Sequence, residues 1–182
     1  MKCSEDLEFP SDYIFSHRSP SKKEVRWLYE WLIENKSEYE LKNLLEFSCG
    51  ITSWVLCEAL DPDRYIAVDK YKRLALFVKN NLPKVQLVEE WKVIDILPNK
   101  YDLILIDGST CVPADIRIKG RGVYREEALK YSEKMLTDNA LVIMHDWNNK
   151  RGGWRRLRNY LDGNYKFLAG CKIGFGFGIY QR

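Results

Sequence analysis

The sequence contains no run of about 20 consecutive apolar residues, so it predicts no membrane-spanning helix. Its first residues, MKCSEDLEFPSDY, include acidic side chains where a secretory signal peptide would be apolar. We therefore expect a soluble, cytoplasmic protein that does not bind membranes.

Cysteine pairs are also lacking, because the five cysteines are odd in number, far apart and without C-x-x-C spacing. This pattern argues against a disulfide framework and a structural zinc site, and favours reduced thiols.

Internal repeats, low-complexity tracts and linkers are absent as well from the 182 residues. Hydrophobic residues make up 46% of the sequence and aromatic residues 13%, which is enough to fill a substantial core. These features predict one domain over residues 1–182. Within it, we expect residues 1–40 to form a helical cap segment and residues 41–182 to form the core. The oligomeric state is left open.

The net charge is only +3, but it is unevenly distributed along the chain. Residues 115–182 contain 14 Lys or Arg and 7 Asp or Glu, whereas acidic residues predominate before them. The basic residues gather in RIKGRGVYR (117–125) and KRGGWRRLR (150–158). Such segments can bind phosphate, an anionic glycan or nucleic acid. The alternative is that they form a solvated helix face and a loop without a binding role.

The order of the predicted elements indicates the fold. A first helix begins after Ser21, where Ser21 and Glu24 form a capping box before a run with helical spacing of apolar residues. Short apolar segments without polar alternation predict buried parallel strands at 43–47, 65–68, 85–88, 103–106 and 140–144. Helices are predicted between them at 52–60, 72–80 and 123–136. This alternation predicts an α/β fold with a doubly wound, mostly parallel sheet.

The last segment departs from this order. In IGFGFGIYQR (173–182), apolar side chains alternate strictly with glycines. Together with YKFLAG (165–170), it predicts a closing hairpin whose last strand is antiparallel to the rest of the sheet. The glycine face is expected to serve packing, and it would also allow another side chain or backbone to approach closely.

The first predicted strand ends near Glu46 and runs through a turn into a helix, in NLLEFSCGITSWVL (43–56). Turns of this kind hold nucleotides in α/β sheets, but Gly50 is the only glycine here. The second strand ends at Asp69, where a carboxylate can accept hydrogen bonds from both hydroxyls of a ribose. The order and spacing of these two features predict an adenosine-binding site.

Ionisable residues also follow the fourth and fifth predicted strands. Asp107 ends YDLILID, and His145 and Asp146 end ALVIMHD, with Asn148 two residues later. Consecutive ionisable residues after an apolar run are hard to explain as core, and the chain contains only two histidines. Because the carboxyl ends of parallel strands meet at one edge of the sheet, we predict that His145, Asp107 and Asp146 form a catalytic group.

The segments LLEFSCGITS, IAVDK, YDLILIDGS and LVIMHDW together resemble the class I S-adenosylmethionine-dependent methyltransferases, over about residues 43–180. This resemblance implies a Rossmann-like, seven-stranded sheet with an antiparallel last strand. It also implies that the turn after the first strand wraps the methionine part of S-adenosylmethionine, that Asp69 holds the ribose, and that Glu89 or Glu90 lies near the adenine. The implied cofactor-binding residues are Glu46, Ser48, Cys49, Gly50, Thr52, Ser53, Asp69, Lys70, Glu90 and Asp107.

The turn departs from the family's E/D-x-G-x-G-x-G pattern at two of the three glycines, which are replaced by Ser48 and Thr52. Both side chains are small. A cofactor without phosphate does not require the close backbone approach that a pyrophosphate requires. The departure therefore argues against a dinucleotide and is compatible with S-adenosylmethionine.

A second, more local resemblance concerns the methyl acceptor. No N-P-P-Y type motif follows the fourth strand, so methyl transfer to amino groups of adenine or glutamine loses support. The segment from IDGSTCVPADIRIKGRGVYREEAL to HDWNNKRGGWRRL is similar to the glucuronoxylan 4-O-methyltransferase group. That similarity implies a sugar or other small hydroxylated acceptor. The loop Thr110–Gly122, with its charges, glycines and Pro113, is long enough to be a substrate-binding lid. For such an acceptor, we expect Trp147, Trp154, Arg155 and Arg156 to stack on the sugar and hydrogen-bond it.

Two mechanisms are open at this point. In the first, His145 removes the proton of the acceptor hydroxyl and is oriented by Asp107 or Asp146, or one of these carboxylates is itself the base. In the second, Asp107, Asp146 and Asn148 bind a divalent cation such as Mg²⁺, which lowers the pKa of the hydroxyl.

Two rival functions are open as well. The basic C-terminal segments favour an RNA or DNA methyltransferase. The glycine-poor turn favours a methyltransferase-like protein that binds a ligand or a partner without catalysis.

Overall fold

A computed structural model of the chain describes residues 7–13, 15, 19–69, 72–89, 100–107, 121–149 and 152–182. Within these residues, seven strands form one sheet in the order β3-β2-β1-β4-β5-β7-β6. The strands are β1 (Asn43–Phe47), β2 (Arg64–Val68), β3 (Val85–Val88), β4 (Tyr101–Ile106), β5 (Leu136–His145), β6 (Lys166–Gly170) and β7 (Phe177–Gln181). β7 is antiparallel to both of its neighbours, and the other strand pairs are parallel. This confirms the predicted Rossmann-like sheet with an antiparallel last strand.

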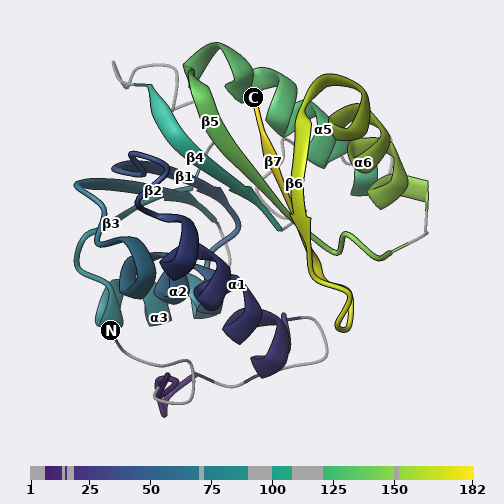
Figure 1. Ribbon diagram of the computed structural model, residues 1–182. Helices are drawn as coiled ribbons and strands as arrows, with labels where there is room; N and C mark the ends of the chain where they lie inside the picture. The colour runs from purple at the N-terminus through teal and green to yellow at the C-terminus, as the bar shows by residue number, and fades with distance from the viewer. Residues whose placement is uncertain are drawn as a thin grey trace.

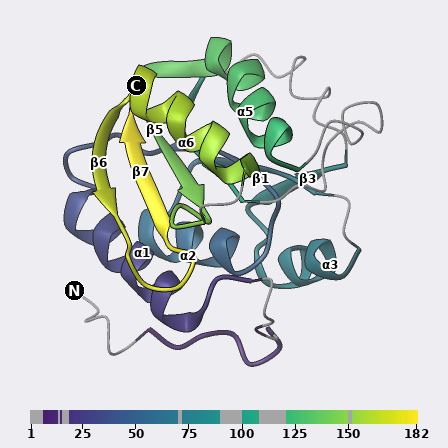
Figure 2. The same ribbon diagram turned by 90° about the vertical axis from the view of Figure 1, so that its right-hand side faces the viewer.

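Helices cover both faces of the sheet (Figure 1, Figure 2). On one face lie α1 (Lys22–Asn35), α2 (Ile51–Leu60) and α3 (Lys72–Asn81), and on the other lie α5 (Arg121–Ser132) and α6 (Gly152–Asn164). Each face has its own hydrophobic cluster, one containing Leu28 and Val55 and the other containing Leu129 and Leu157. None of the helices in the described part of the chain combines the length and apolar character that a membrane-spanning segment requires.

The first helix begins at the predicted capping box. The hydroxyl of Ser21 accepts a hydrogen bond from the N–H of Glu24 (3.3 Å), and the Glu24 carboxylate accepts one from the N–H of Ser21 (2.7 Å). The buried side of α1, which includes Val25 and Leu32, belongs to the same hydrophobic cluster as α2. This packing places the first turn of α1, which contains Glu24, on the same face of the sheet as α2.

The direction of strand addition reverses between β1 and β4, which lie side by side. β1 leads outward to β2 and β3, whereas β4 leads to β5 on the other side. Just beyond this pair, the N–H of Asp107 donates to the carbonyl of Phe47 (3.2 Å). Ligands bind at such a switch point in open α/β sheets, so the residues that follow β1, β2, β4 and β5 are positioned to form a site.

Two predicted elements were partly wrong. The helix predicted at 123–136 ends at Ser132, because Leu136 already pairs with Tyr101 as the first residue of β5. Residues 173–176 were predicted as strand but form a turn. Gly174 and Gly176 have φ of +56° and +69°, outside the β region, so the alternating glycines build a turn that exposes the intervening side chains.

Candidate functional site

The turn between β1 and α2 has an unusual backbone. Gly50, directly before the helix, has φ of +149°, a conformation that side chains rarely adopt, which explains the glycine at this position. Ser48 has φ of +79°, in the region that glycine favours. Thr52 instead lies inside the first turn of α2. Of the two replaced glycines, therefore, only the one at Ser48 stands where the backbone itself favours glycine.

Glu46 is fully buried beneath this turn. Its Oε1 accepts a hydrogen bond from the hydroxyl of Thr52, and its Oε2 accepts from those of Ser53 and Tyr65 (2.6 Å). Burial raises the pKa of Glu46 to about 8, although the three hydroxyl groups act in the opposite direction. The Ser53 hydroxyl also accepts from the N–H of Gly50 (3.0 Å), so this network fixes the start of α2. A direct contact of Glu46, Thr52 or Ser53 with a cofactor stays a prediction.

Asp69 lies at the end of β2, against the same turn. Its Oδ2 accepts hydrogen bonds from the N–H of Cys49 (2.9 Å) and from the hydroxyl of Ser48 (3.3 Å). The carboxylate is buried, and the backbone N–H of Asp69 continues the sheet by donating to Val88 (3.0 Å). The structure thus joins the two features from which the adenosine site was predicted, the turn and the acidic residue after β2.

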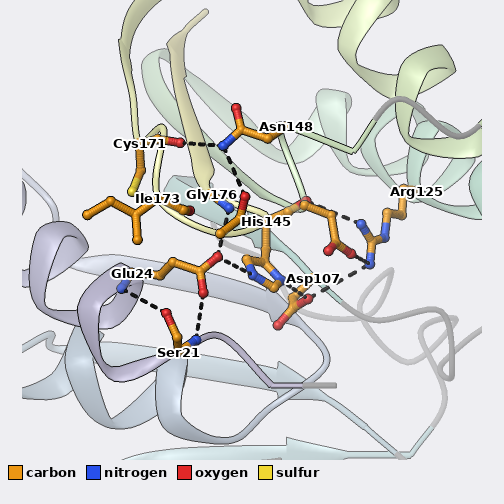
Figure 3. A network of polar contacts seen from close by, with 11 residues as sticks. Ser21, Glu24, Asp107, Arg125, His145, Asn148, Cys171, Ile173 and Gly176 are labelled. Atoms are coloured by element: carbon orange, nitrogen blue, oxygen red, sulfur yellow. Dashed lines mark hydrogen bonds and ion pairs between the residues drawn. The ribbon is translucent and has the colours of Figure 1, made fainter. Parts of the chain in front are cut away.

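Asp107 and His145 end the neighbouring strands β4 and β5, and their side chains point toward each other (Figure 3). Nδ1 of His145 lies 2.8 Å from Oδ1 of Asp107. Burial by itself would lower the pKa of His145. The charge and hydrogen bond of Asp107, together with the nearby carboxylate of Glu24, outweigh burial and raise this pKa to about 10. His145 is therefore an imidazolium at neutral pH in this arrangement.

Arg125 reaches this pair from α5. Its guanidinium donates to Oδ2 of Asp146 (3.1 Å) and to the carbonyl of His145 (3.2 Å), and it lies 3.8 Å from Oδ1 of Asp107. The ring of Trp154 packs against it, with the ring centroid 3.0 Å from the central carbon. The Arg125 side chain is only 3% exposed. Two carboxylates of the site therefore share one buried cation, which sequence reasoning missed because Arg125 had been grouped with a surface basic segment.

Glu24 reaches His145 from the opposite side, out of the first turn of α1 (Figure 3). Its Oε1 accepts a hydrogen bond from the N–H of Gly176 (2.7 Å) and lies 3.7 Å from Nε2 of His145. Burial by itself would raise the pKa of Glu24, but its interactions with His145, Ser21 and Gly176 bring the pKa to about 2. Sequence reasoning missed Glu24 as a site residue because its capping role already accounted for it.

The predicted metal ligands do not fit a divalent cation in this arrangement. Atoms of Asp107, His145 and Asp146 do lie within 4.8 Å of one another, as ligands of one ion would. However, the guanidinium of Arg125 already lies against both carboxylates, and Nδ1 of His145 faces Asp107. Asn148 donates its amide to carbonyls of the turn between β6 and β7. An ion bound by the two carboxylates would have to displace Arg125, so no metal-assisted step follows from this geometry.

The residues predicted to contact a sugar have other surroundings. Trp147 packs against Gly178, where a Cβ atom would lie 2.3 Å from the indole ring. Trp154 covers the guanidinium described above. Arg155 and Arg156 are exposed on α6, a helix that was not predicted. The two indole rings therefore contribute to packing around the site. None of their described contacts supports the predicted stacking on a sugar.

Some predicted site residues lie outside the described part of the chain, namely Lys70, Glu90 and residues 110–120 of the predicted lid. Glu89, the alternative adenine neighbour, is exposed after β3. The remaining predicted residues form two groups. The first, at the carboxyl ends of β1 and β2, contains Glu46, Ser48, Cys49, Gly50, Thr52, Ser53 and Asp69. The second, at the carboxyl ends of β4 and β5, contains Asp107, His145 and Asp146.

No protein-family model matches the sequence, and no curated protein matches it either. Solved structures with the same fold are numerous. An O-methyltransferase from Bacillus cereus in complex with SAH has a TM-score of 0.64 at 13% identity, over 92% of this chain and 84% of that one. The O-methyltransferase TomG from Streptomyces achromogenes in complex with SAM has a TM-score of 0.58 at 17% identity, over 90% and 81%. SAM-bound CalS10, an amino pentose methyltransferase from Micromonospora echinaspora, has a TM-score of 0.57 at 10% identity, over 88% and 90%. The chain thus has the fold of these S-adenosylmethionine-dependent methyltransferases.

Proposed function

We propose that the protein is an S-adenosylmethionine-dependent O-methyltransferase that acts on a small hydroxylated acceptor, with carbohydrates as the first class to test. The observation that carries this proposal is the pair of Asp107 and His145 beside the turn after β1, at the switch point of the sheet. A buried acidic residue, Asp69, contacts that turn from β2. The residues predicted to bind the cofactor thus lie next to an ionisable group.

The first group fits an adenosyl cofactor that has no phosphate. A carboxylate at the position of Asp69 accepts hydrogen bonds from ribose hydroxyls, and Cys49 and Ser48 hold that carboxylate in place. The conformation of Gly50, with φ of +149°, lets the chain turn tightly from β1 into α2 at the place where the methionine part is predicted to bind. When bound, S-adenosylmethionine supplies a methyl group that its sulfonium has already activated. The protein then has to align the acceptor and receive a proton.

We assign the contact with the acceptor hydroxyl to Asp107. Its side chain is 19% exposed, whereas that of His145 is 3% exposed. With a pKa of about 10, His145 carries both ring protons at neutral pH and has no lone pair to accept another. The cofactor would supply the methyl group to the acceptor oxygen and leave as S-adenosylhomocysteine, and Asp107 would receive the hydroxyl proton and pass it to water. His145 and Arg125 keep the carboxylate ionised and oriented.

A carboxylate suffices as the proton acceptor because the hydroxyl becomes a much stronger acid as its oxygen bonds to the methyl carbon. Interactions that keep Asp107 ionised lower its pKa against the opposing effect of burial. The same interactions limit its strength as a base. The main contribution of Asp107 is therefore to orient the acceptor oxygen toward the methyl group.

Two observations support a carbohydrate acceptor. The carboxylates of Asp107 and Asp146, 19% and 15% exposed, offer hydrogen-bond acceptors to two hydroxyls of one ligand. The segment that contains them resembles the glucuronoxylan 4-O-methyltransferase group, and an amino pentose methyltransferase is among the proteins with this fold.

Incubation with methyl-labelled S-adenosylmethionine and a panel of oligosaccharides, small phenols, RNA and DNA tests the proposal. We expect label in oligosaccharides, at a site that resists mild base as an ether does. Label in nucleic acid alone, with binding that weakens steeply as salt rises, would favour the nucleic-acid rival. Binding of the cofactor without transfer to any acceptor would favour the non-catalytic rival.

A further inference from the structure

We propose that Glu24, in the N-terminal helix, is a positioning residue of this site. It holds the imidazole of His145 between two carboxylates and thereby fixes the orientation of Asp107. The effect on turnover rests on the proposed function, whereas the effect on His145 does not.

The two ring nitrogens of His145 face two different carboxylates. Nδ1 lies 2.8 Å from Asp107, and Nε2 lies 3.7 Å from Glu24. Nε2 is buried and has no hydrogen-bond partner among the described residues, so Glu24 provides the opposite charge at this end of the ring. Phe177 packs beside the ring, with the two ring centroids 4.8 Å apart. Rotation of the imidazole would break both charged contacts at once.

Glu24 is itself held by groups from distant parts of the chain. Its Oε2 accepts from the N–H of Ser21, and its Oε1 accepts from the N–H of Gly176, both at 2.7 Å. The turn between β6 and β7 comes so close that a Cβ atom at Gly174 would lie 2.8 Å from the Glu24 carboxylate. Glycine at this position therefore makes room for the carboxylate. The glycines in this segment were expected from the sequence to allow such a close approach by another side chain.

The same turn is attached to the end of β5. The N–H of Trp147 donates to the carbonyl of Gly176 (3.2 Å), and the N–H of Asn148 donates to that of Phe175 (2.7 Å). The amide of Asn148 donates to the carbonyl of Cys171 (3.0 Å). The turn whose N–H binds Glu24 is thus hydrogen-bonded to the residues that follow His145. These contacts hold Glu24 and His145 at a fixed distance from each other.

Helix capping alone does not explain this arrangement. The capping box uses Oε2 of Glu24 and the hydroxyl of Ser21, whereas Oε1 contacts Gly176 and His145. The two roles belong to different atoms, and they can be separated by substitution. The other charged groups near His145 are Asp107, Asp146 and Arg125. Of these, Asp107 and Arg125 lie on the side away from Glu24 (Figure 3).

Two variants separate the roles. Glu24→Gln removes the charge that faces His145 and keeps the size of the side chain. Ser21→Ala removes the hydroxyl that caps the helix and leaves the Glu24 carboxylate unchanged. If Glu24 positions His145, ¹⁵N spectra at pH 8 will show the doubly protonated ring in wild type and in Ser21→Ala, and a neutral fraction in Glu24→Gln. Turnover will fall about tenfold in Glu24→Gln, with KM for the cofactor changed less than about twofold, and Ser21→Ala will keep wild-type turnover.

The same result in both variants would overturn the inference. If both variants lower only Tm and leave the His145 signals unchanged, Glu24 is a helix cap and nothing more. Glu24→Asp provides a second test if Glu24→Gln does not fold, because it keeps the charge and withdraws the carboxylate from His145 by one methylene. It should also lower turnover. If the His145 signals shift but no variant or wild-type sample transfers a methyl group, the inference on His145 stands and the proposed function fails.

Discussion

Nδ1 of His145 and Oδ1 of Asp107 lie 2.8 Å apart across the ends of two neighbouring strands. The register of the sheet produces this contact. Ile106 in β4 pairs with Met144 in β5, so the next residue on each strand is Asp107 or His145. Partners in a parallel pair point to the same face of the sheet, which brings the two side chains together. The chemistry of the site thus follows directly from strand register.

The charged state of His145 predicts a loss of stability at alkaline pH. Its pKa of about 10 in the folded chain lies above the ordinary value of 6.5. Its contribution to the free energy of unfolding is therefore fully present below about pH 6.5 and is lost as the pH rises through 10. Urea unfolding of wild type and His145→Gln at pH 6, 8 and 10 measures this contribution. The difference between the two proteins should shrink by up to about 4 kcal/mol across this range. A difference that does not change with pH would contradict the raised pKa.

The catalytic pair predicts a specific loss of turnover. Asp107→Asn and His145→Ala should each lower kcat by a factor on the order of 100 or more, because the acceptor oxygen loses its proton acceptor or the group that orients it. Asp138, an exposed residue of β5, gives a matched control, and Asp138→Asn should behave as wild type. Single-turnover rates with labelled cofactor provide the measurement. Full activity in Asp107→Asn would remove Asp107 from the mechanism.

The position of Arg125 predicts that activity does not depend on a metal ion. Wild type should keep its activity in excess EDTA, because the guanidinium of Arg125 and the imidazolium of His145 already balance the charge of the two carboxylates. In Arg125→Met those carboxylates lose their buried partner, so the free energy of unfolding should fall by about 3 kcal/mol. Millimolar Mn²⁺ should then raise the Tm of the variant and not that of wild type. Loss of wild-type activity in EDTA, restored by Mg²⁺, would show that this account of the site is wrong.

The contact of Trp147 with β7 predicts different effects for two Gly→Ala variants. A Cβ at Gly178 would lie 2.3 Å from the indole ring, whereas a Cβ at Gly163 in α6 would meet no atom within 4 Å apart from its chain neighbours and its own helix backbone. Gly178→Ala should lower the free energy of unfolding by about 2 to 3 kcal/mol, because the overlap forces the ring or the strand to shift. Gly163→Ala should be neutral or stabilising by up to roughly 1 kcal/mol. Equal stability of the two variants in urea would contradict this packing.

The sheet and the strand ends were predictable from the sequence because they depend on local patterns. Short apolar runs placed β1 and β3 at their observed bounds, and the ends of two other runs, which became β2 and β4, placed Asp69 and Asp107. Residues 173–176 were mispredicted because alternation describes a strand only where the backbone is extended, and glycine at alternate positions also permits a turn.

Glu24 and Arg125 were not predictable in the same way. Each lies on a helix far from His145 in the sequence, and each has a common local explanation: a capping box for Glu24 and a basic segment for Arg125. Their contacts with the site come from the packing of α1 and α5 on opposite faces of the sheet. No periodicity in one sequence encodes such a meeting of three segments.

Calorimetry with S-adenosylmethionine tests the central claim most directly, because it requires no knowledge of the acceptor. We predict one binding site per chain with a dissociation constant on the order of 10 μM. Asp69→Asn should weaken binding by roughly tenfold or more through loss of the charged acceptor, and Asp138→Asn should leave it unchanged. No heat of binding at millimolar cofactor, with a folded wild-type protein, would contradict the account.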